Sequence, residues 1–231
     1  MQVRAVSENA VLVEFGQQID EALIPVIAAA TDALWKQLAS VLIDLVPSYT
    51  TLLCIYDHNQ VDSGWMVRSV QRCVDASVPD NGIVTSGKLV EIPVWYDPRV
   101  GYDLEALAGS KALGINDLIE LHTGRDYQVF AIGFNPGFAF LGRLDERIAT
   151  PRRSTPRKSV ARGSVGIADA QTAVYPLASP GGWNIIGRTP HAMFDASVTH
   201  GDASFLSVGD RVRFVPIDQE EFRALGGQLN G

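Results

Sequence analysis

Basic side chains cluster in one segment of the chain. Seven of the 19 basic residues fall between positions 143 and 162, where two acidic residues oppose them. Two Pro-Arg steps, at 151–152 and 156–157, fix the backbone direction ahead of an arginine. In a chain with a formal net charge of −7, this local excess predicts a site for an anion such as a phosphate or a carboxylate. Charge alone leaves a solvated basic loop open as the alternative. The basic residues are Arg143, Arg147, Arg152, Arg153, Arg157, Lys158 and Arg162.

Aromatic residues and glycines flank this cluster on both sides. The segment GFNPGFAFLG (133–142) precedes it, and SPGGWNIIGRTP (179–190) follows it. Their aromatic side chains either line an apolar pocket or belong to the core of a small barrel. The glycine spacing matches neither the phosphate-binding loop nor the dinucleotide-binding fingerprint, so the glycines indicate tight turns. The aromatic residues are Phe134, Phe138, Phe140 and Trp183.

A histidine closes the segment LHTG at the end of a predicted helix. His122 could act as an acid or base near neutral pH, or could cap the helix as a cation. No serine lies in a nucleophile-elbow context, and no Cys/His cluster indicates a metal site. The residues alone therefore indicate a β-rich, anion-binding domain with an aromatic pocket.

Composition narrows the class of protein. The 231 residues include 26 acidic side chains, which argues against non-specific binding of nucleic acid. Cys54 and Cys73 are the only cysteines, too few for a disulfide framework, so a reducing compartment fits best. We see no signal peptide and no apolar run long enough to span a bilayer. The expectation is a soluble cytoplasmic protein without nucleic-acid or membrane partners.

The elements that must position these residues fall into two groups. Residues 1–80 predict strands and helices in the order β-α-β-β-α, most of a ferredoxin-like split βαβ unit to which one more strand can be added. A turn at Pro79-Asp80-Asn81-Gly82 opens a predicted linker over 81–87. The predicted elements are a strand at 11–15, a helix at 21–38, strands at 41–46 and 51–56, and a helix at 61–76.

Residues 88–218 form the second predicted domain, which is mostly β. A strand over 88–96 contains Pro93, which suits an edge strand or a bulge. Short helices at 103–113 and 116–122 have Asp103 and Asn116 placed as N-caps. From 127 onward, short strands broken by Gly and Pro are typical of a compact barrel or sandwich. A short helix and a Gly-rich tail are expected over 219–231.

Long motifs along nearly the whole chain resemble those of the family formed by the B subunits of 5-oxoprolinase. The family is also known as the KipI-like or allophanate hydrolase subunit 1 family, and as subdomains C and D of biotin-dependent carboxyltransferases. The resemblance implies an α+β fold, with an N-terminal ferredoxin-like α/β domain followed by a cyclophilin-like β-barrel. The motifs are LVEFG, VPSYTTLL, EIPVWYD, GYDLEALA, GFNPGFAFLG, PRRSTPR, GSVGIADAQTAVYP and SPGGWNIIGRTP.

The resemblance also implies a function and a set of site residues. It implies a B subunit that works with a homologous C subunit and with the separate A subunit, hydrolysing ATP, with magnesium, to convert 5-oxo-L-proline into L-glutamate. Arg157 and Arg188 would bind an anion. Gln171 would form a hydrogen bond to the substrate amide, and Trp183 would line the pocket. The implied catalytic residues are His122, Arg157, Gln171 and Arg188, and the implied binding residues are Phe138, Arg152, Tyr175, Gly182 and Trp183; no metal ligand is implied.

Three other functions stay open at this point, one of which, a peptidyl-prolyl isomerase role, is suggested only by analogy with the cyclophilin-like fold. Members of the family can inhibit a sensor histidine kinase, and others take part in allophanate or urea-type amide hydrolysis or carboxyl transfer, although this chain has no biotinyl Met-Lys site. The chain also departs from the family pattern in one segment. Ala161-Arg162 replaces the usual Pro-Ala, and Asp169 and Ala173 replace usual glycines.

Overall fold

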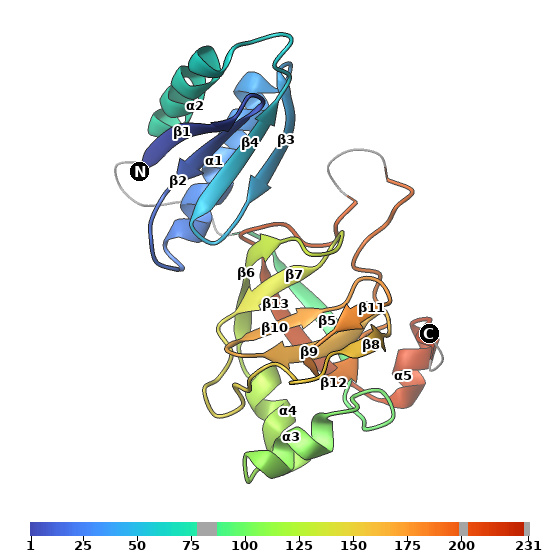
Figure 1. Cartoon of the computed structure of the whole chain (residues 1–231). Helices are drawn as coiled ribbons and strands as arrows, with labels where there is room; N and C mark the ends of the chain where they lie inside the picture. The colour runs from blue at the N-terminus through green and yellow to red at the C-terminus, as the bar shows by residue number, and fades with distance from the viewer. Residues whose placement is uncertain (78–86, 199–202, 229–231) are drawn as a thin grey trace. The chain divides into compact units, whose positions relative to one another are not determined.

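The computed structural model describes residues 1–77, 87–198 and 203–228. The chain forms two compact units, Met1–Gly87 and Lys88–Gly231 (Figure 1). Most of the predicted linker over 81–87 lies outside the described residues. None of the helices in the described ranges is both long enough and apolar enough to cross a membrane.

The first unit is a four-stranded antiparallel sheet with two helices on one face. Alternate residues of one strand, Leu52, Cys54 and Tyr56, are buried in a cluster shared with both helices, so the helices cover the same face of the sheet. The strands pair in the order β1-β2-β4-β3. The elements are β1 (Gln2–Ser7), β2 (Ala10–Glu14), α1 (Leu23–Leu38), β3 (Leu42–Pro47), β4 (Thr51–Tyr56) and α2 (Ser63–Ser77).

This unit confirms the predicted β-α-β-β-α order but not the ferredoxin-like arrangement. β4 lies between β2 and β3, as in a split βαβ unit. The added strand is β1, which precedes β2 in the chain and pairs with it as a hairpin. The sequence does not predict β1, because five of its six side chains are exposed and the alternation of polar and apolar residues lasts for only four positions before Val6 interrupts it.

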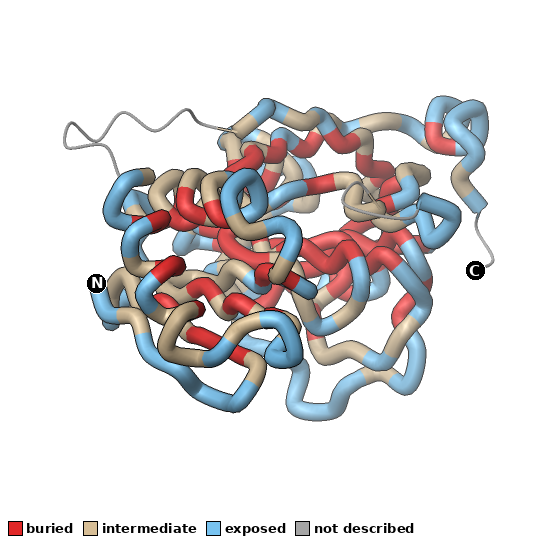
Figure 2. Tube along the Cα trace, turned by 90° about the horizontal axis from the view of Figure 1, so that it is seen from above, coloured by how far each residue is buried: buried red, intermediate tan, exposed pale blue. Residues whose placement is uncertain are grey.

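The second unit contains a closed barrel of seven strands in the order β10-β7-β6-β13-β5-β12-β9, which confirms the predicted barrel. The larger apolar core belongs to this unit. Figure 2 marks the buried residues of the chain in red. A separate two-stranded ribbon pairs β8 with β11. The elements are β5 (Leu89–Trp95), α3 (Leu104–Ser110), α4 (Ile115–Thr123), β6 (Asp126–Ile132), β7 (Ala139–Gly142), β8 (Arg157–Val160), β9 (Ser164–Ala168), β10 (Gln171–Val174), β11 (Ser179–Gly181), β12 (Asn184–Arg188), β13 (Arg211–Ile217) and α5 (Gln219–Ala224).

The strand that contains Pro93, β5, belongs to this closed barrel and pairs with β13 without a bulge, so the prediction of an edge strand or a bulge is wrong. β5 runs parallel to β13 over all seven of its residues. On the other side, β5 pairs with β12 at one position, where Trp95 faces Arg188. A strand that is paired along its length on one side alone tolerates the missing N–H of a proline.

Of the two predicted helix N-caps, one is wrong and the other is confirmed in its position. α4 begins after Gly114, whose N–H donates to Asp117 Oδ2 at 2.9 Å, so Asn116 is not its N-cap. Asp103 does occupy the N-cap position of α3, but its carboxylate does not bond to that helix. α5 is capped by Asp218 and buries Phe222 against Trp95, so this short helix packs on the barrel unit.

Candidate functional site

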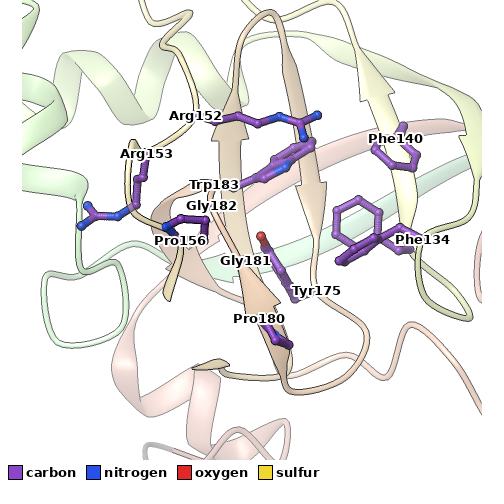
Figure 3. Close-up of a pocket in the computed structure, with 11 residues that line it drawn as sticks. Phe134, Phe140, Arg152, Arg153, Pro156, Tyr175, Pro180, Gly181, Gly182 and Trp183 are labelled. Carbon is purple, nitrogen blue, oxygen red and sulfur yellow. The ribbon is translucent and has the colours of Figure 1, made fainter. Parts of the chain in front are cut away.

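The five binding residues implied by the resemblance line one pocket on the outside of the barrel. The pocket has a volume of about 350 Å³ and lies beside the ribbon of β8 and β11 (Figure 3). This volume falls at the lower end of the range for ligand pockets, roughly 300–1,000 Å³. The lining residues are Phe134, Phe138, Phe140, Arg152, Arg153, Pro156, Tyr175, Pro180, Gly181, Gly182 and Trp183.

Phe138 is the centre of the aromatic wall. Its ring lies edge-on to Phe140, Tyr175 and Trp183, with centroid distances of 4.9, 5.3 and 5.6 Å. Edge-to-face contacts of this kind hold rings in fixed orientations. Both alternatives for the aromatic residues therefore apply, because Phe138, Tyr175 and Trp183 are buried as a small core and also form the floor of a pocket.

A close approach of backbone to ring explains one of the glycines. A Cβ atom on Gly181 would overlap the phenol of Tyr175. Gly182 has more room, since a Cβ there would meet its nearest atoms, in Pro156 and Arg153, at ordinary contact distances of 3.7 Å and more. The Pro-Gly-Gly turn thus lets the chain pass directly over Tyr175 and closes one side of the pocket.

Phe134 stands at the pocket in a strained conformation. Its φ is 70°, in the left-handed region that bulky residues rarely adopt, and 68% of its surface is exposed. Its ring lies 5.5 Å from that of Phe138, edge-on. Such strain costs about 1–3 kcal/mol and clusters at functional sites. An exposed, strained aromatic beside an aromatic pocket indicates a side chain placed for a ligand.

Asp103 connects the arginine loop to the barrel. Its carboxylate accepts two hydrogen bonds from Arg157, both at 2.8 Å, and one from Arg153 at 2.6 Å. The same carboxylate accepts the backbone N–H of Ile185 at 2.7 Å. Its side chain is 8% exposed, so this charge is largely removed from water. A carboxylate at the start of α3 therefore holds the loop over 151–157 against β12.

The side chain of Arg152 contacts different groups from those that its neighbour Arg153 contacts. Its guanidinium carbon lies 6.0 Å from the centre of the Trp183 ring. Its Nε lies 3.8 Å from Asp169 Oδ2, and both side chains are more than half exposed. Figure 3 shows Arg152 extending over Trp183, whereas the guanidinium of Arg153 points away from the aromatic rings. Arg152 is thus the cation that faces the pocket.

The four implied catalytic residues do not come together at this pocket. Arg157 is held by Asp103 and lies over the ring of Tyr102 at 5.5 Å. Arg188 is buried and donates to the Tyr102 hydroxyl and the Gln228 carbonyl, beside a second, polar cavity of about 190 Å³. Gln171 lies half-buried on β10, outside the residues that line the aromatic pocket.

His122 lies in the barrel core, which corrects its interpretation as an acid, a base or a cationic cap. Its Nδ1 is 2.8 Å from the Tyr96 hydroxyl, and its Nε2 is 2.8 Å from that of Thr172. Its ring stacks on Phe214 with centroids 4.6 Å apart. Burial lowers the pKa of His122 from 6.5 to about 3, so the ring is neutral at physiological pH. Both ring nitrogens therefore form hydrogen bonds within the core.

Asp103 is the site residue whose importance the sequence did not indicate, and for Phe134 the sequence indicated an aromatic pocket residue but not its positive φ. The only sequence signal for Asp103 was its position before a helix, which predicts a cap. Asp169 stands where the resemblance implies a glycine. Its φ of 52° lies in the left-handed region that glycine adopts more easily, which explains why a glycine suits this position. Its carboxylate now lies beside Arg152.

ATP with Mg²⁺ does not fit the aromatic pocket. No carboxylate lies among the described residues that line it, and two of the nearby arginines already share Asp103. The described parts of the chain also hold no group of three or more His, Cys, Asp or Glu residues that could bind a metal ion. No reaction step is therefore assigned to a nucleotide in this pocket.

The burial of His122 predicts a pH dependence of stability. Because its pKa is about 3 in the folded chain and near 6.5 when unfolded, the unfolded state binds the extra proton between these values. This one group should therefore lower the free energy of unfolding by about 1.4 kcal/mol for each pH unit as the pH falls below roughly 6. In His122→Gln this part of the slope should be missing, as measured by urea unfolding at several pH values. An unchanged slope would show that His122 does not titrate in this way.

Removing the charge of Asp103 should destabilise the barrel unit. Asp103→Asn leaves two guanidinium groups beside a neutral amide, and breaking a buried ion pair costs about 3 kcal/mol or more. Asp126→Asn is a matched control, since Asp126 also faces two arginines, Arg211 and Arg213, but at a more exposed position. The control should lose about 1 kcal/mol or less in denaturant unfolding. Equal losses in the two variants would contradict the importance of the buried carboxylate.

Comparison with known proteins agrees with this architecture. Residues 1–203 match the family described as carboxyltransferase domain, subdomain C and D. The chain is 35% identical to the B subunit of 5-oxoprolinase from Bacillus subtilis (strain 168), over 99% of this chain and 98% of that protein.

Solved structures have the same fold. The crystal structure of TTHA0988 matches with a TM-score of 0.78 and 32% identity, over 94% of this chain and 40% of that one. Urea carboxylase of Kluyveromyces lactis matches over 96% of this chain and 22% of its own, with a TM-score of 0.71; at 18% identity, this likeness concerns the fold alone. The chain therefore belongs to the family of 5-oxoprolinase B subunits, within the carboxyltransferase subdomain C and D group.

Proposed function

We propose that this chain is the B subunit of an ATP-dependent 5-oxoprolinase and acts in a complex with the A and C subunits. The overall reaction consumes 5-oxo-L-proline, ATP and water, and releases L-glutamate, ADP and phosphate. The observation that carries the proposal is the likeness to a 5-oxoprolinase B subunit over almost the full length of both chains. The aromatic pocket supports it, because a small planar lactam ring suits a small cavity walled by aromatic rings.

The contribution of this chain is to bind and orient the substrate ring. The edge-to-face set around Phe138 fixes the floor of the pocket, and Trp183 offers a face for the planar amide. Arg152 supplies a positive charge at the rim. Holding a substrate in one orientation lowers the entropy cost of reaction with groups that other subunits present. The proposal therefore expects turnover in the complex and none from this chain alone.

Reconstitution tests the proposed function directly. The full chain is purified with the candidate C subunit, the A subunit is added, and release of glutamate from 5-oxo-L-proline is measured with ATP. Glutamate should appear only when all three proteins and ATP are present. A stable complex without turnover would contradict the proposal and favour a different amide or carboxyl-transfer substrate. Failure to form any complex would favour the kinase-inhibitor hypothesis.

Phe134 offers a separate test of the pocket. Phe134→Gly should keep or raise the stability of the chain, by up to about 1 kcal/mol, because glycine relieves the strain of a positive φ. The same variant should raise the KM for 5-oxo-L-proline roughly two- to tenfold in the complex, because an aromatic contact contributes about 0.5–1.5 kcal/mol.

Ala112→Gly is the matched control for Phe134→Gly. Ala112 also has a positive φ, of 54°, but lies in the turn after α3 and does not line the pocket. It should change stability in the same direction and leave the KM unaltered. A KM for Phe134→Gly equal to that of the unmodified chain would remove Phe134 from the binding site.

A further inference from the structure

We propose that the aromatic pocket takes a small planar ligand with a single carboxylate, that Arg152 binds this carboxylate, and that the pocket excludes a nucleotide triphosphate. The choice of 5-oxo-L-proline as the probe rests on the proposed function. The charge and shape argument rests on the residues of the pocket itself, so binding and turnover can be tested separately.

The shape of the pocket favours a flat ligand of modest size. The rings of Phe138, Tyr175 and Trp183 are locked edge-to-face, so they present fixed walls and cannot easily move apart. Gly181 and Gly182 bring the backbone close on one side, and Phe134 stands on the other (Figure 3). A cavity of about 350 Å³ between such walls suits one ring with a short substituent.

The charges near the pocket add up to one surplus positive charge. Arg153 and Arg157 share the single carboxylate of Asp103, and Arg152 lies 3.8 Å from Asp169. Three guanidinium groups thus face two carboxylates. A ligand with one negative charge completes this balance, whereas the several charges of a triphosphate exceed it, and the lining residues hold no carboxylate for an accompanying Mg²⁺. The basic segment therefore indicates a monoanion, although its composition alone would also fit phosphate.

Asp103 determines which arginine is available to a ligand. Arg157 donates both of its terminal nitrogens to this buried carboxylate, and Arg153 donates one. The backbone N–H of Arg153 also donates to the Gly182 carbonyl at 2.7 Å, which fixes the loop against the pocket wall. The guanidinium of Arg157 is therefore committed to holding the loop, and that of Arg153 is partly so, although Arg153 also lines the pocket. Arg152, between Pro151 and these anchored residues, is left facing the cavity.

Arg152 can exchange its present partner for a ligand. At 3.8 Å, its contact with Asp169 is longer than a hydrogen bond, and both side chains are exposed. Ion pairs of this kind contribute little to stability because water screens them. A ligand carboxylate in a partly apolar pocket can instead accept two parallel N–H bonds from the planar guanidinium, which is a stronger arrangement. Asp169 therefore acts as a weak competitor for Arg152.

Calorimetric binding tests the proposal with the full chain, alone and in complex with the candidate C subunit. The probes are 5-oxo-L-proline, 2-pyrrolidinone (the same ring without the carboxylate) and ATP. Arg152→Gln should weaken binding of 5-oxo-L-proline at least tenfold and leave the weaker binding of 2-pyrrolidinone unchanged. Arg152→Lys should restore part of the affinity, and Asp169→Asn should strengthen binding severalfold by removing the competitor. ATP should not displace 5-oxo-L-proline.

Arg147→Gln is the matched control. Arg147 belongs to the same basic segment, but it is exposed, pairs with Asp145 and does not line the pocket. It should leave the affinity for 5-oxo-L-proline unchanged. A loss equal to that in Arg152→Gln would show that general charge, not a specific contact, attracts the ligand, and would overturn the proposal.

The other outcomes separate this inference from the proposed function. Unaltered binding in Arg152→Gln, competition by ATP, or no binding of 5-oxo-L-proline to either the chain or the complex would overturn the inference. Turnover by a complex that contains Arg152→Gln, with an unchanged KM, would overturn it while leaving the proposed function intact. Binding that depends on Arg152 in a complex without turnover would support the pocket and reject the 5-oxoprolinase activity.

Discussion

A largely buried carboxylate holds together three parts of the barrel unit that lie far apart in the chain. Asp103 at the start of α3 bonds to Arg153 and Arg157 in the loop before and at the start of β8, and to the backbone of Ile185 on β12. A carboxylate that has lost its water is tolerated only when hydrogen bonds and opposite charge replace the water. This requirement determines where the loop lies and how the two guanidinium groups are directed. It thereby also positions one wall of the pocket.

The pocket that this loop borders combines rigidity with local strain. The rings around Phe138 pack as tightly as a core, yet they leave a cavity, and Phe134 remains exposed with a positive φ. Folding alone gives no reason to keep a large apolar side chain both exposed and strained, since glycine at that position would be less costly. Under the proposed function, a ligand that contacts the ring supplies the reason, because the gain in binding would offset the loss in folding free energy.

The sequence predicted most helices and strands, and its motifs identified the residues that line the pocket. Periodicity finds elements that bury one face, so it located α1 and β4 but missed β1, which buries almost nothing. Charge counting found the basic segment but not the pairing of Arg157 with a carboxylate 54 residues away. The position of His122 near a helix end predicted an acid, a base or a cap, whereas packing of α4 on the barrel buries that ring completely. The last two failures have a common cause, because each depends on contacts between segments that are far apart in the chain, whereas β1 was missed because its side chains are exposed.

The pocket also lacks the groups that a complete hydrolase site needs. Its described lining residues include no histidine and no carboxylate, and burial raises the pKa of Tyr175, so its phenol stays protonated and does not accept a proton at neutral pH. The described lining consists mainly of rings, two arginines of which Arg152 is the more exposed, and a closely approaching backbone, which can bind and orient a ligand. Under the proposed function, proton transfer must then come from residues outside this pocket. A site that binds a substrate without supplying the groups for proton transfer would need other subunits to complete the reaction, so such a chain would act as one part of a larger enzyme.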